Sequence, residues 1–147
     1  MIDPVVRRAT REDHGQLRDL ESEARAALVG QRGGDRWLDE HPAIGDGWSA
    51  KCSAADVFVG TIDDVVIAYL IAELGQDRIV RIEQVWVTPE ARELGFGDEL
   101  LAKAIASAKD RGAVGVEGQA LPGDRQTKNL YERAGIVARL IITFRQL

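Results

Sequence analysis

A glycine-containing turn, Arg92-Glu93-Leu94-Gly95-Phe96-Gly97, joins a β-branched stretch ending in Val85-Trp86-Val87 to an amphipathic stretch typical of a helix. The first backbone N–H groups of a helix have no partner within it, and the helix dipole is positive there, so a helix that begins at this turn favours an anion. Glycine at 95 and 97 removes side chains that would hold the anion away. Arg92 adds a positive charge, and the turn therefore predicts a phosphate site.

Two other phosphate motifs that place glycines before a helix do not fit this turn. A Walker loop needs Gly-Lys followed by Ser or Thr, which the turn lacks. A dinucleotide fingerprint needs Gly or Ala three positions after Gly97, where the chain has Leu100. An ordinary strand-to-helix connection is the plain alternative to a phosphate site.

The remaining pattern, Arg-x-x-Gly-x-Gly between a Val-x-Val-x-Pro strand and an amphipathic helix, resembles the coenzyme A motif of the GCN5-related N-acetyltransferase superfamily. Downstream, Leu130-Tyr131-Glu132-Arg133-Ala134-Gly135-Ile136 is similar to the family's Leu-Tyr-x-x-x-Gly-Phe segment, with Ile136 in place of Phe. The resemblance covers nearly the whole chain. It implies transfer of an acetyl group from acetyl-CoA to an amine acceptor, either a small molecule or a protein amine.

The resemblance also assigns cofactor contacts by position. It implies that the strand Val85-Trp86-Val87 offers backbone hydrogen bonds to the acetyl and pantetheine part, and that Arg92 to Asp98 wrap the pyrophosphate. The valines also read as buried strand residues, and both readings hold together. At the position of Asp124 the family usually carries an asparagine that contacts the pantetheine arm. The Asp124 carboxylate can accept hydrogen bonds from that arm but cannot donate them when it is ionised.

Tyr131 falls where the resemblance implies the tyrosine that donates to the departing thiolate. A phenol, with a pKa of about 10, can share a proton with a thiolate whose acid has a pKa of about 8.5. The alternative is a helix tyrosine that packs on the sheet with its hydroxyl in water.

The acceptor amine must lose a proton before it attacks, because an ammonium has no lone pair. Glu83 is the candidate base, since alternation along the strand places it on the same face as Val85. Burial beside the cofactor is expected to raise its pKa. A surface carboxylate paired with Arg81 is the other reading, and water can also serve as the base.

Hydrophobic periodicity and turn signals predict the elements that position these residues. Thr10 to Asp13 is expected to cap the first helix, and Asp63-Asp64 to turn a hairpin. The predicted strands are Pro4–Ala9, Val57–Thr61, Val65–Leu74, Arg78–Thr88, Ala113–Leu121 and Ile136–Arg145, and the predicted helices cover 17–28, 100–111 and 125–134. This order predicts an α/β fold, a three-layer α/β/α mixed sheet of the acyl-CoA N-acyltransferase type.

Two segments depart from a simple pattern. The stretch from Gly30 to Ala55 is expected to be a long loop with a short helix around Arg36 to Glu40, and it is a candidate for the acceptor site. After the last helix there is room for one strand where the family usually has two. An open sheet edge invites pairing, so a homodimer in which a second subunit covers the edge is expected.

Length and composition bound the class of protein. The 147 residues predict one domain over 1–147, with a net charge of −5 that gives no general attraction for nucleic acid. No apolar run is long enough to span a membrane, and the single Cys52 and the opening residues predict a cytoplasmic protein. His14 and His41 are too few and too poorly spaced for a metal site, so no metal is expected.

Three functions remain open at this stage. The leading one is the acetyl-CoA-dependent N-acetyltransferase. A second is a non-catalytic acyl-CoA-binding sensor or interaction module of the same fold, which Asp124 and the short end of the sheet favour. A third is a phosphate-binding domain unrelated to coenzyme A, which Leu100 disfavours.

Overall fold

A computed structural model describes residues 4–147 of the chain. Its strands are β1 (Pro4–Arg8), β2 (Asp56–Ile62), β3 (Val65–Leu74), β4 (Ile79–Val87) and β5 (Gly115–Gly118). Its α-helices are α1 (His14–Ala26), α2 (Gly34–Glu40), α3 (Trp48–Ala54), α4 (Phe96–Asp110) and α5 (Arg125–Arg133), with short 3-10 helices η1 (Arg11–Asp13) and η2 (Pro89–Leu94). In this part of the chain no helix combines the length and the apolar character that crossing a bilayer requires.

The strands form one mixed sheet in the order β1-β2-β3-β4-β5. Neighbours from β1 to β4 are antiparallel, and β5 is parallel to β4 after the crossover through α4. Asp63 and Asp64 connect β2 to β3 with φ angles of 49° and 65°. Left-handed conformations at both central residues are typical of a tight hairpin turn, so the predicted hairpin is confirmed.

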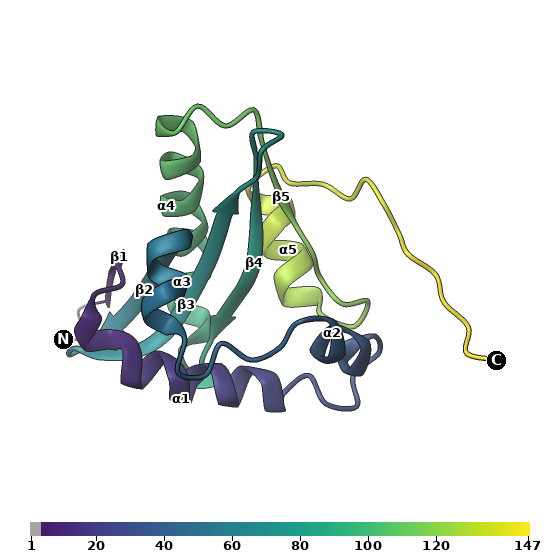
Figure 1. Cartoon of the computed structure of the whole chain (residues 1–147), viewed down its shortest axis with the longest axis horizontal. Coiled ribbons are helices and arrows are strands. Elements are labelled where there is room, and N and C mark those ends of the chain that lie inside the picture. Colours follow the sequence, from purple (N-terminus) through teal and green to yellow (C-terminus); the bar gives the residue numbers. More distant parts are fainter. Residues whose placement is uncertain (1–3) are drawn as a thin grey trace.

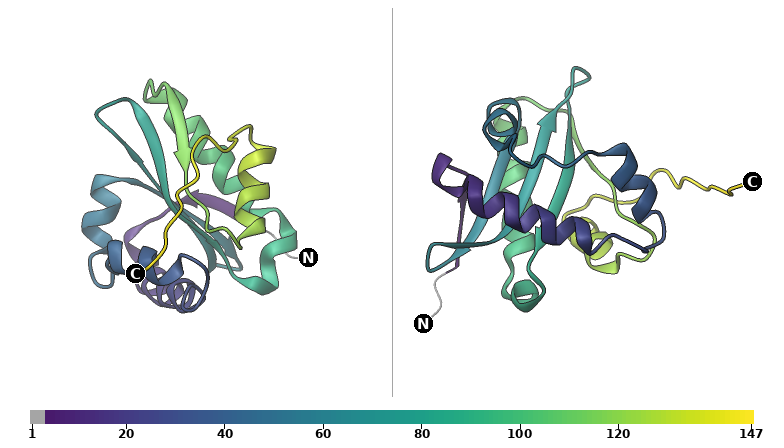
Figure 2. Two further views of the ribbon diagram at one scale, coloured as in Figure 1. Left: turned by 90° about the vertical axis from the view of Figure 1, so that its right-hand side faces the viewer. Right: turned by 60° about the horizontal axis from the view of Figure 1, so that its bottom comes forward.

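Helices cover both faces of the sheet (Figures 1 and 2). One buried cluster joins α4 and α5 to side chains that include Phe58, Leu70 and Ile82. The other joins α1 and α3 to the opposite face, including Val59 and Tyr69. The two clusters use alternate residues of the central strands, which gives the three-layer α/β/α arrangement expected from the sequence.

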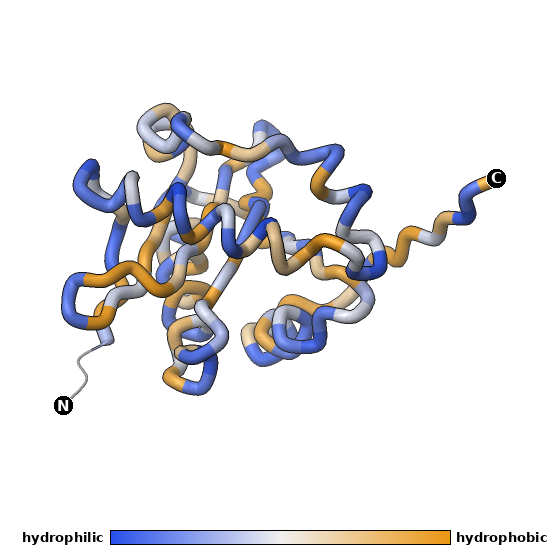
Figure 3. The backbone as a smooth tube through the Cα atoms, turned by 90° about the horizontal axis from the view of Figure 1, so that it is seen from below, coloured by the Kyte–Doolittle hydropathy of each residue, from blue (hydrophilic) through white to orange (hydrophobic). Residues whose placement is uncertain are grey.

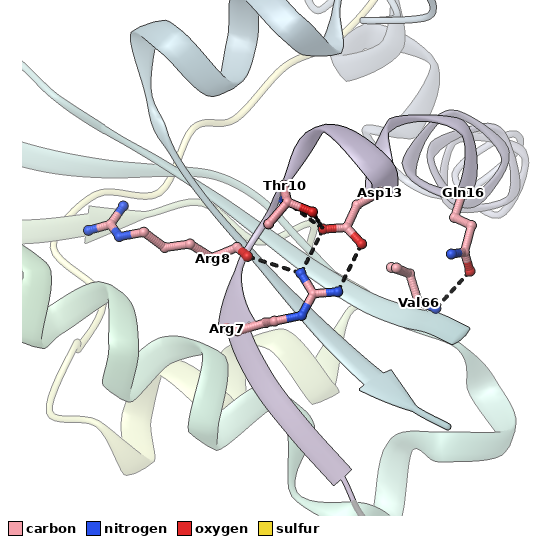
Figure 4. Close-up of polar contacts among 6 residues, drawn as sticks. All are labelled: Arg7, Arg8, Thr10, Asp13, Gln16 and Val66. Atoms are coloured by element: carbon pink, nitrogen blue, oxygen red, sulfur yellow. Dashed lines mark hydrogen bonds and ion pairs between the residues drawn. The ribbon is translucent and has the colours of Figure 1, made fainter. Parts of the chain in front are cut away.

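The start of α1 is fixed by the buried carboxylate of Asp13 (Figure 4). This carboxylate accepts hydrogen bonds from the Arg7 guanidinium at 2.7 and 2.9 Å and from the Thr10 backbone N–H at 2.6 Å. A second contact ties the helix to the sheet, because the Gln16 amide oxygen accepts from the Val66 N–H at 2.8 Å. Thr10 is the N-cap residue of η1, so the predicted capping position is correct.

The expected loop from Gly30 to Ala55 is wrong in part. It contains α2, close to the predicted short helix, and also α3, which was not predicted. Only Trp48 and the half-buried Cys52 of α3 face the core strongly, and flanking Gly, Asp and Pro mask so short a pattern. Burial of Trp48 against Tyr69, with ring centroids 5.7 Å apart, holds α3 in place.

The predicted last strand, Ile136–Arg145, is also wrong. Ile136 packs on the core, but residues 137–147 belong to no helix or strand. A strand is defined by hydrogen bonds to a neighbour, and β-branched composition alone does not supply that neighbour. The sheet therefore has β5 at its edge, consistent with a shortened C-terminal strand region.

Substituting Asp13 with Asn should lower the free energy of unfolding by about 2 kcal/mol, because it leaves the Arg7 guanidinium without its charged partner. The hydrogen bond from Arg7 holds the pKa of Asp13 below its usual value. The stabilisation is therefore complete above about pH 4 and is lost as the pH falls through the folded-state pKa.

Urea unfolding of the Asp13→Asn variant at pH 7 and pH 3 measures both effects. The gap between the variant and the unchanged protein should shrink at pH 3. Asp19→Asn, at an exposed position of α1, serves as the control and should change little. A gap that does not depend on pH would contradict the ionic role of Asp13.

Candidate functional site

Strands β4 and β5 stay paired for only part of the length of β4. Their register runs from Ile79 opposite Gly115 to Ile82 opposite Gly118, where β5 ends. β4 continues to Val87, paired on its other side with Ala68 of β3. From Glu83 onward, the backbone of β4 on the β5 side thus has no strand partner, and can hydrogen-bond an extended molecule that carries amide groups.

The strands part at a β-bulge. Ile71 lies opposite Gln84 and Ala72 opposite Ile82, so Glu83 is the extra residue of β4. Its neighbour Gln84 accepts a hydrogen bond from the Tyr69 hydroxyl at 2.6 Å, on the α1–α3 side of the sheet, whereas Val85 packs with the α4–α5 cluster. The bulge shifts by one residue the alternation of β4 side chains between the two faces of the sheet. Bulges often change the direction of side chains in this way beside functional sites.

Simple alternation predicted that Glu83 and Val85 lie on the same face of the sheet. This prediction is wrong, because the bulge places them on opposite faces. Its carboxylate accepts hydrogen bonds from Lys51 Nζ of α3 at 3.0 and 3.3 Å. The predicted alternative, a pair with Arg81, is also wrong, because Arg81 pairs with Asp77 at 2.7 Å and Glu117 at 3.4 Å. The bulge is the physical reason for both errors, since it turns Glu83 toward α3.

Glu83 shares its surroundings with a second carboxyl group, that of Glu73 on β3. Burial would raise the pKa of Glu83, but hydrogen bonds from Glu73 and Lys51 outweigh it and hold the pKa below its usual value. The hydrogen bond with Glu83 raises the pKa of Glu73 above its usual value. The expected rise in the pKa of Glu83 is thus not found, and the two carboxyl groups and Lys51 form one charged cluster.

A hollow of about 150 Å³, here called the β4–β5 hollow, opens where the strands part. Its lining residues are His41, Arg81, Ile82, Glu83, Glu117, Gly118 and Gln119. The His41 ring lies 2.8 Å through Nδ1 from the Trp37 carbonyl oxygen, which can only accept, so Nδ1 donates. The hollow thus offers carboxylate and imidazole acceptors, beside the Arg81 guanidinium, to a group that donates hydrogen bonds.

Sequence reasoning missed His41, Lys51 and Glu73 as residues of this site. His41 follows α2 and Lys51 lies on the unpredicted α3, so no local pattern related them to β4. Glu73 lies opposite Arg81 in the register, and only the bulge brings it beside Glu83. The predicted β3–β4 pairing could have suggested Glu73 as a neighbour of Glu83 across the two strands. The sequence does not reveal the bulge that brings the two side chains together.

Tyr131 lies on α5, directly behind the end of β5. A Cβ atom at Gly118 would come within 2.6 Å of its ring, and its hydroxyl donates to the Gln119 carbonyl oxygen at 3.4 Å. Burial, and secondarily the Asp124 carboxylate, raise the pKa of Tyr131 well above its usual value. The hydroxyl therefore keeps its proton at ordinary pH and is placed to donate where the strands part.

The first turn of α4 begins at Gly95, whose φ of 85° requires the left-handed conformation that glycine adopts readily. Glu99 N–H bonds to the Gly95 carbonyl at 3.2 Å, so the N–H groups of Phe96, Gly97 and Asp98 precede the first intrahelical bond. These three N–H groups can bind an anion.

The side chains of this turn leave room for that anion. Asp98 is held by Arg133 of α5 at 3.0 Å, and this pair offsets the carboxylate that would otherwise repel phosphate. Phe96 is buried, with its ring 2.5 Å from where a Cβ atom of Gly60 would lie. Gly60 thus makes room for the Phe96 ring, and only the backbone of Phe96 is available to a ligand.

Arg92 fixes the connection between β4 and α4. Its Nε donates to the Val87 carbonyl at 3.0 Å, and its guanidinium lies 4.8 Å from the Trp86 ring centroid. Glu93 and Leu94 follow it in η2 with exposed side chains. The first half of the predicted turn, Arg92 to Leu94, is therefore the end of a 3-10 helix, and Phe96 and Gly97 already belong to α4. Arg92 ties this connection to the end of β4.

Asp124 is the N-cap residue of α5. Its carboxylate accepts from the Thr127 N–H at 3.0 Å and from the Thr127 hydroxyl at 2.7 Å. This cap was not predicted, although Asp before a helix is a typical N-cap signal. A contact of Asp124 with a cofactor stays a prediction.

Comparison with known proteins relates the chain to one family of enzymes. The family model described as "Acetyltransferase (GNAT) family" matches residues 16–136. A comparison with curated proteins finds no match.

Solved structures share the fold at low sequence identity. A mutant BH1408 protein from Bacillus halodurans is 19% identical, with a TM-score of 0.80, over 97% of this chain and 99% of that one. The aminoglycoside N-acetyltransferase AAC(6')-Iy, in complex with a bisubstrate analogue, is 16% identical, with a TM-score of 0.71, over 99% of both chains. The ribosomal-protein-alanine N-acetyltransferase from Brucella melitensis biovar Abortus is 15% identical, with a TM-score of 0.69, over 100% and 98%.

Substituting Gly118 with Ala should lower the free energy of unfolding by about 1–3 kcal/mol, because the new methyl group overlaps the Tyr131 ring. Gly115→Ala in the same strand is the control, since nothing lies within 4 Å of a Cβ atom there. Chemical unfolding of both variants measures the difference. Equal stabilities would show that Tyr131 is not packed against Gly118.

Proposed function

The chain belongs to the acetyltransferase (GNAT) family, and from that premise we propose that it transfers the acetyl group of acetyl-CoA directly to an amine acceptor. The observation that carries the proposal is the parting of β4 and β5 between the α4 N-terminus and Tyr131. We infer that the cofactor runs along these three features, with the anion-binding N–H groups at one end and the hydroxyl donor at the other.

The cofactor would use backbone groups more than side chains. We assign the pyrophosphate to the N–H groups of Phe96, Gly97 and Asp98, with Arg92 to Gly95 forming the turn before them. The pantetheine arm and the thioester would take hydrogen bonds from β4 between Val85 and Val87, on the side that β5 leaves open. A backbone N–H of this strand would also stabilise the negative oxygen of the tetrahedral intermediate.

Transfer requires two proton movements, and the site offers a group for each. As the amine nitrogen bonds to the acetyl carbon and the C–S bond breaks, the Tyr131 hydroxyl would donate to the departing sulfur. Because burial raises the pKa of Tyr131, the hydroxyl remains protonated in the resting enzyme. The amine proton would leave through Glu83, directly or through water, since hydrogen bonds keep that carboxylate ionised near neutrality.

The acceptor would enter the β4–β5 hollow. The carboxylates of Glu83 and Glu117, which pair with Lys51 and Arg81, line it together with the ring of His41, and these acceptors suit the N–H groups of an amine. Solved structures of the same fold include an aminoglycoside acetyltransferase and a ribosomal-protein-alanine acetyltransferase, so small and protein amines both suit this architecture. Release of the coenzyme A thiol should therefore be measured with a panel of acceptors that includes both small amines and protein amines.

Substituting Gly97 with Asp should weaken acetyl-CoA binding at least tenfold, because it adds a third carboxylate to the first turn of α4, which already carries Asp98 and Glu99. Calorimetry with acetyl-CoA measures the dissociation constant. Gly15→Asp, at an exposed position of α1 with nothing within 4 Å, adds the same charge elsewhere and should not change binding. Unchanged affinity in Gly97→Asp would exclude the α4 N-terminus as the phosphate site.

Substituting Tyr131 with Phe should lower kcat by about 10- to 100-fold while leaving the dissociation constant of acetyl-CoA nearly unchanged, because only the proton donor is lost. Steady-state thiol release gives kcat. Tyr69→Phe removes the other tyrosine hydroxyl of the chain, which bonds to Gln84 on the opposite face, and should leave kcat within about twofold. Equal losses in both variants would point to a general effect on folding.

A further inference from the structure

Lys51 of α3 places a primary amine against the carboxylate assigned above as the base of the transfer. Its Nζ donates to the two carboxylate oxygens of Glu83 at 3.3 and 3.0 Å. The helix α3, seen end-on at the upper left of Figure 3, mixes hydrophilic and hydrophobic residues, and Lys51 is its one charged residue. The position that an acceptor amine must reach is therefore occupied by an amine of the chain itself.

Contacts at the start of α3 hold this amine in place. Trp48, the first residue of the helix, is buried against the Tyr69 ring. Shortly before the helix, the buried carboxylate of Glu21 on α1 accepts hydrogen bonds from the Ile44 and Gly45 N–H groups at 2.8 and 3.0 Å. A nucleophile held in this way reacts much faster than one that must diffuse in, because its orientation is fixed before the reaction.

The ion pair leaves the amine room to move. The Lys51 and Glu83 side chains are 25% and 29% exposed, and within residues 4–147 the Lys51 Nζ has no other hydrogen-bond partner. The thioester is assigned to the β4 backbone at Val85, two residues and about 7 Å beyond Glu83. Because a strand backbone lies between the two faces of its sheet, the flexible stem of lysine can turn the amine toward the thioester from the α3 side.

We propose that Lys51 is an internal acetyl acceptor, so that the chain acetylates this residue from acetyl-CoA when no other amine occupies the site. The inference rests on the proposed function, because it uses the same donor and the same proton-transferring groups. An external amine that displaces Lys51 from Glu83 competes with the reaction and protects the lysine.

The step balances with the groups already assigned. The Lys51 ammonium gives one proton to Glu83, and its nitrogen then bonds to the acetyl carbon. The C–S bond breaks, and the sulfur keeps the bonding electrons and takes a proton from Tyr131, which the second proton of the nitrogen replaces. The products are Nε-acetyl-Lys51 and the coenzyme A thiol, and the proton on Glu83 passes to water. Acetylation removes the ammonium charge beside Glu83.

Acetylation by a reagent in solution would modify the lysines in the opposite order. Lys103, Lys109 and Lys128 are exposed, whereas Lys51 is half-buried and ion-paired. An ammonium held by a carboxylate has no lone pair to offer, and partial burial restricts the approach of a reagent. A preference for Lys51 therefore marks transfer at the site.

Mass spectrometry of the full chain, incubated with acetyl-CoA and no added amine, tests the proposal. Lys51 should gain an acetyl group about tenfold or more faster than Lys103 or Lys109, at a rate per chain that does not depend on protein concentration. Acetic anhydride, which reacts in solution, should modify the exposed lysines first. The acetyl group should survive hydroxylamine, which would remove a thioester from the neighbouring Cys52.

Three variants separate transfer at the site from chemical acetylation. Lys51→Arg keeps a positive charge beside Glu83 and should abolish the fast reaction, whereas Lys103→Arg, at an exposed position of α4, should leave it unchanged. Glu83→Gln should slow acetylation of Lys51 about tenfold or more, because the base is lost. For a reagent in solution, loss of the ion pair would instead make Lys51 react faster.

The proposal is overturned if Lys51 reacts no faster than Lys103, if its rate rises in proportion to protein concentration, or if Glu83→Gln reacts faster. The measurement on the unchanged protein decides the first two points without relying on the folding of any variant. The proposal also fails separately from the proposed function. Thiol release with external amines, while Lys51 stays unmodified in their absence, would keep the transferase and exclude the internal acceptor.

Discussion

β4 is bonded to β3 along nearly its whole length but to β5 only as far as Ile82, and the candidate site depends on this difference. The bulge at Glu83 lies at the same point. At one place, therefore, β4 loses its β5 partner and the alternation of its side chains between the two faces of the sheet shifts by one residue. Beyond it, Val85 and Val87 pack on the α4–α5 cluster while their backbone on the β5 side stays without a strand partner. The unpaired backbone can remain available because a ligand with amide groups can satisfy it.

The charged groups around β4 are arranged by the same bulge. By turning Glu83 toward α3, it brings Lys51, Glu73 and Glu83 into one cluster on the α1–α3 side. Tyr131 and the α4 N-terminus lie on the other side of the sheet, with the α4–α5 layer. The β4–β5 hollow is lined by Glu83 and by Gly118, which lies against the Tyr131 ring, and the transfer is proposed to take place there.

Much of the fold and part of the site could be predicted from the sequence. The Asp63-Asp64 hairpin, most of helix α4 and the helix of Tyr131 follow from local signals, namely turn residues and apolar spacing. The facing of Glu83 could not, because a bulge is set by pairing with β3 and leaves no mark in alternation.

The ends of elements were harder to predict for the same reason. Ile136–Arg145 has the composition of a strand, but whether it forms one depends on the presence of an edge that it can reach. Helix α3 is held by burial of Trp48 against Tyr69, a contact between distant segments. His41 and Lys51 join the site only through such contacts, so spacing along the chain could not identify them.

The most direct measurement is the structure of the protein with acetyl-CoA bound. The account predicts that the pyrophosphate lies within hydrogen-bond distance of the N–H groups of Phe96, Gly97 and Asp98, that the pantetheine arm runs along β4 from Val87 toward Val85, and that the thioester sulfur lies next to the Tyr131 hydroxyl. A cofactor bound away from the parting of β4 and β5, or with its sulfur remote from Tyr131, would contradict it.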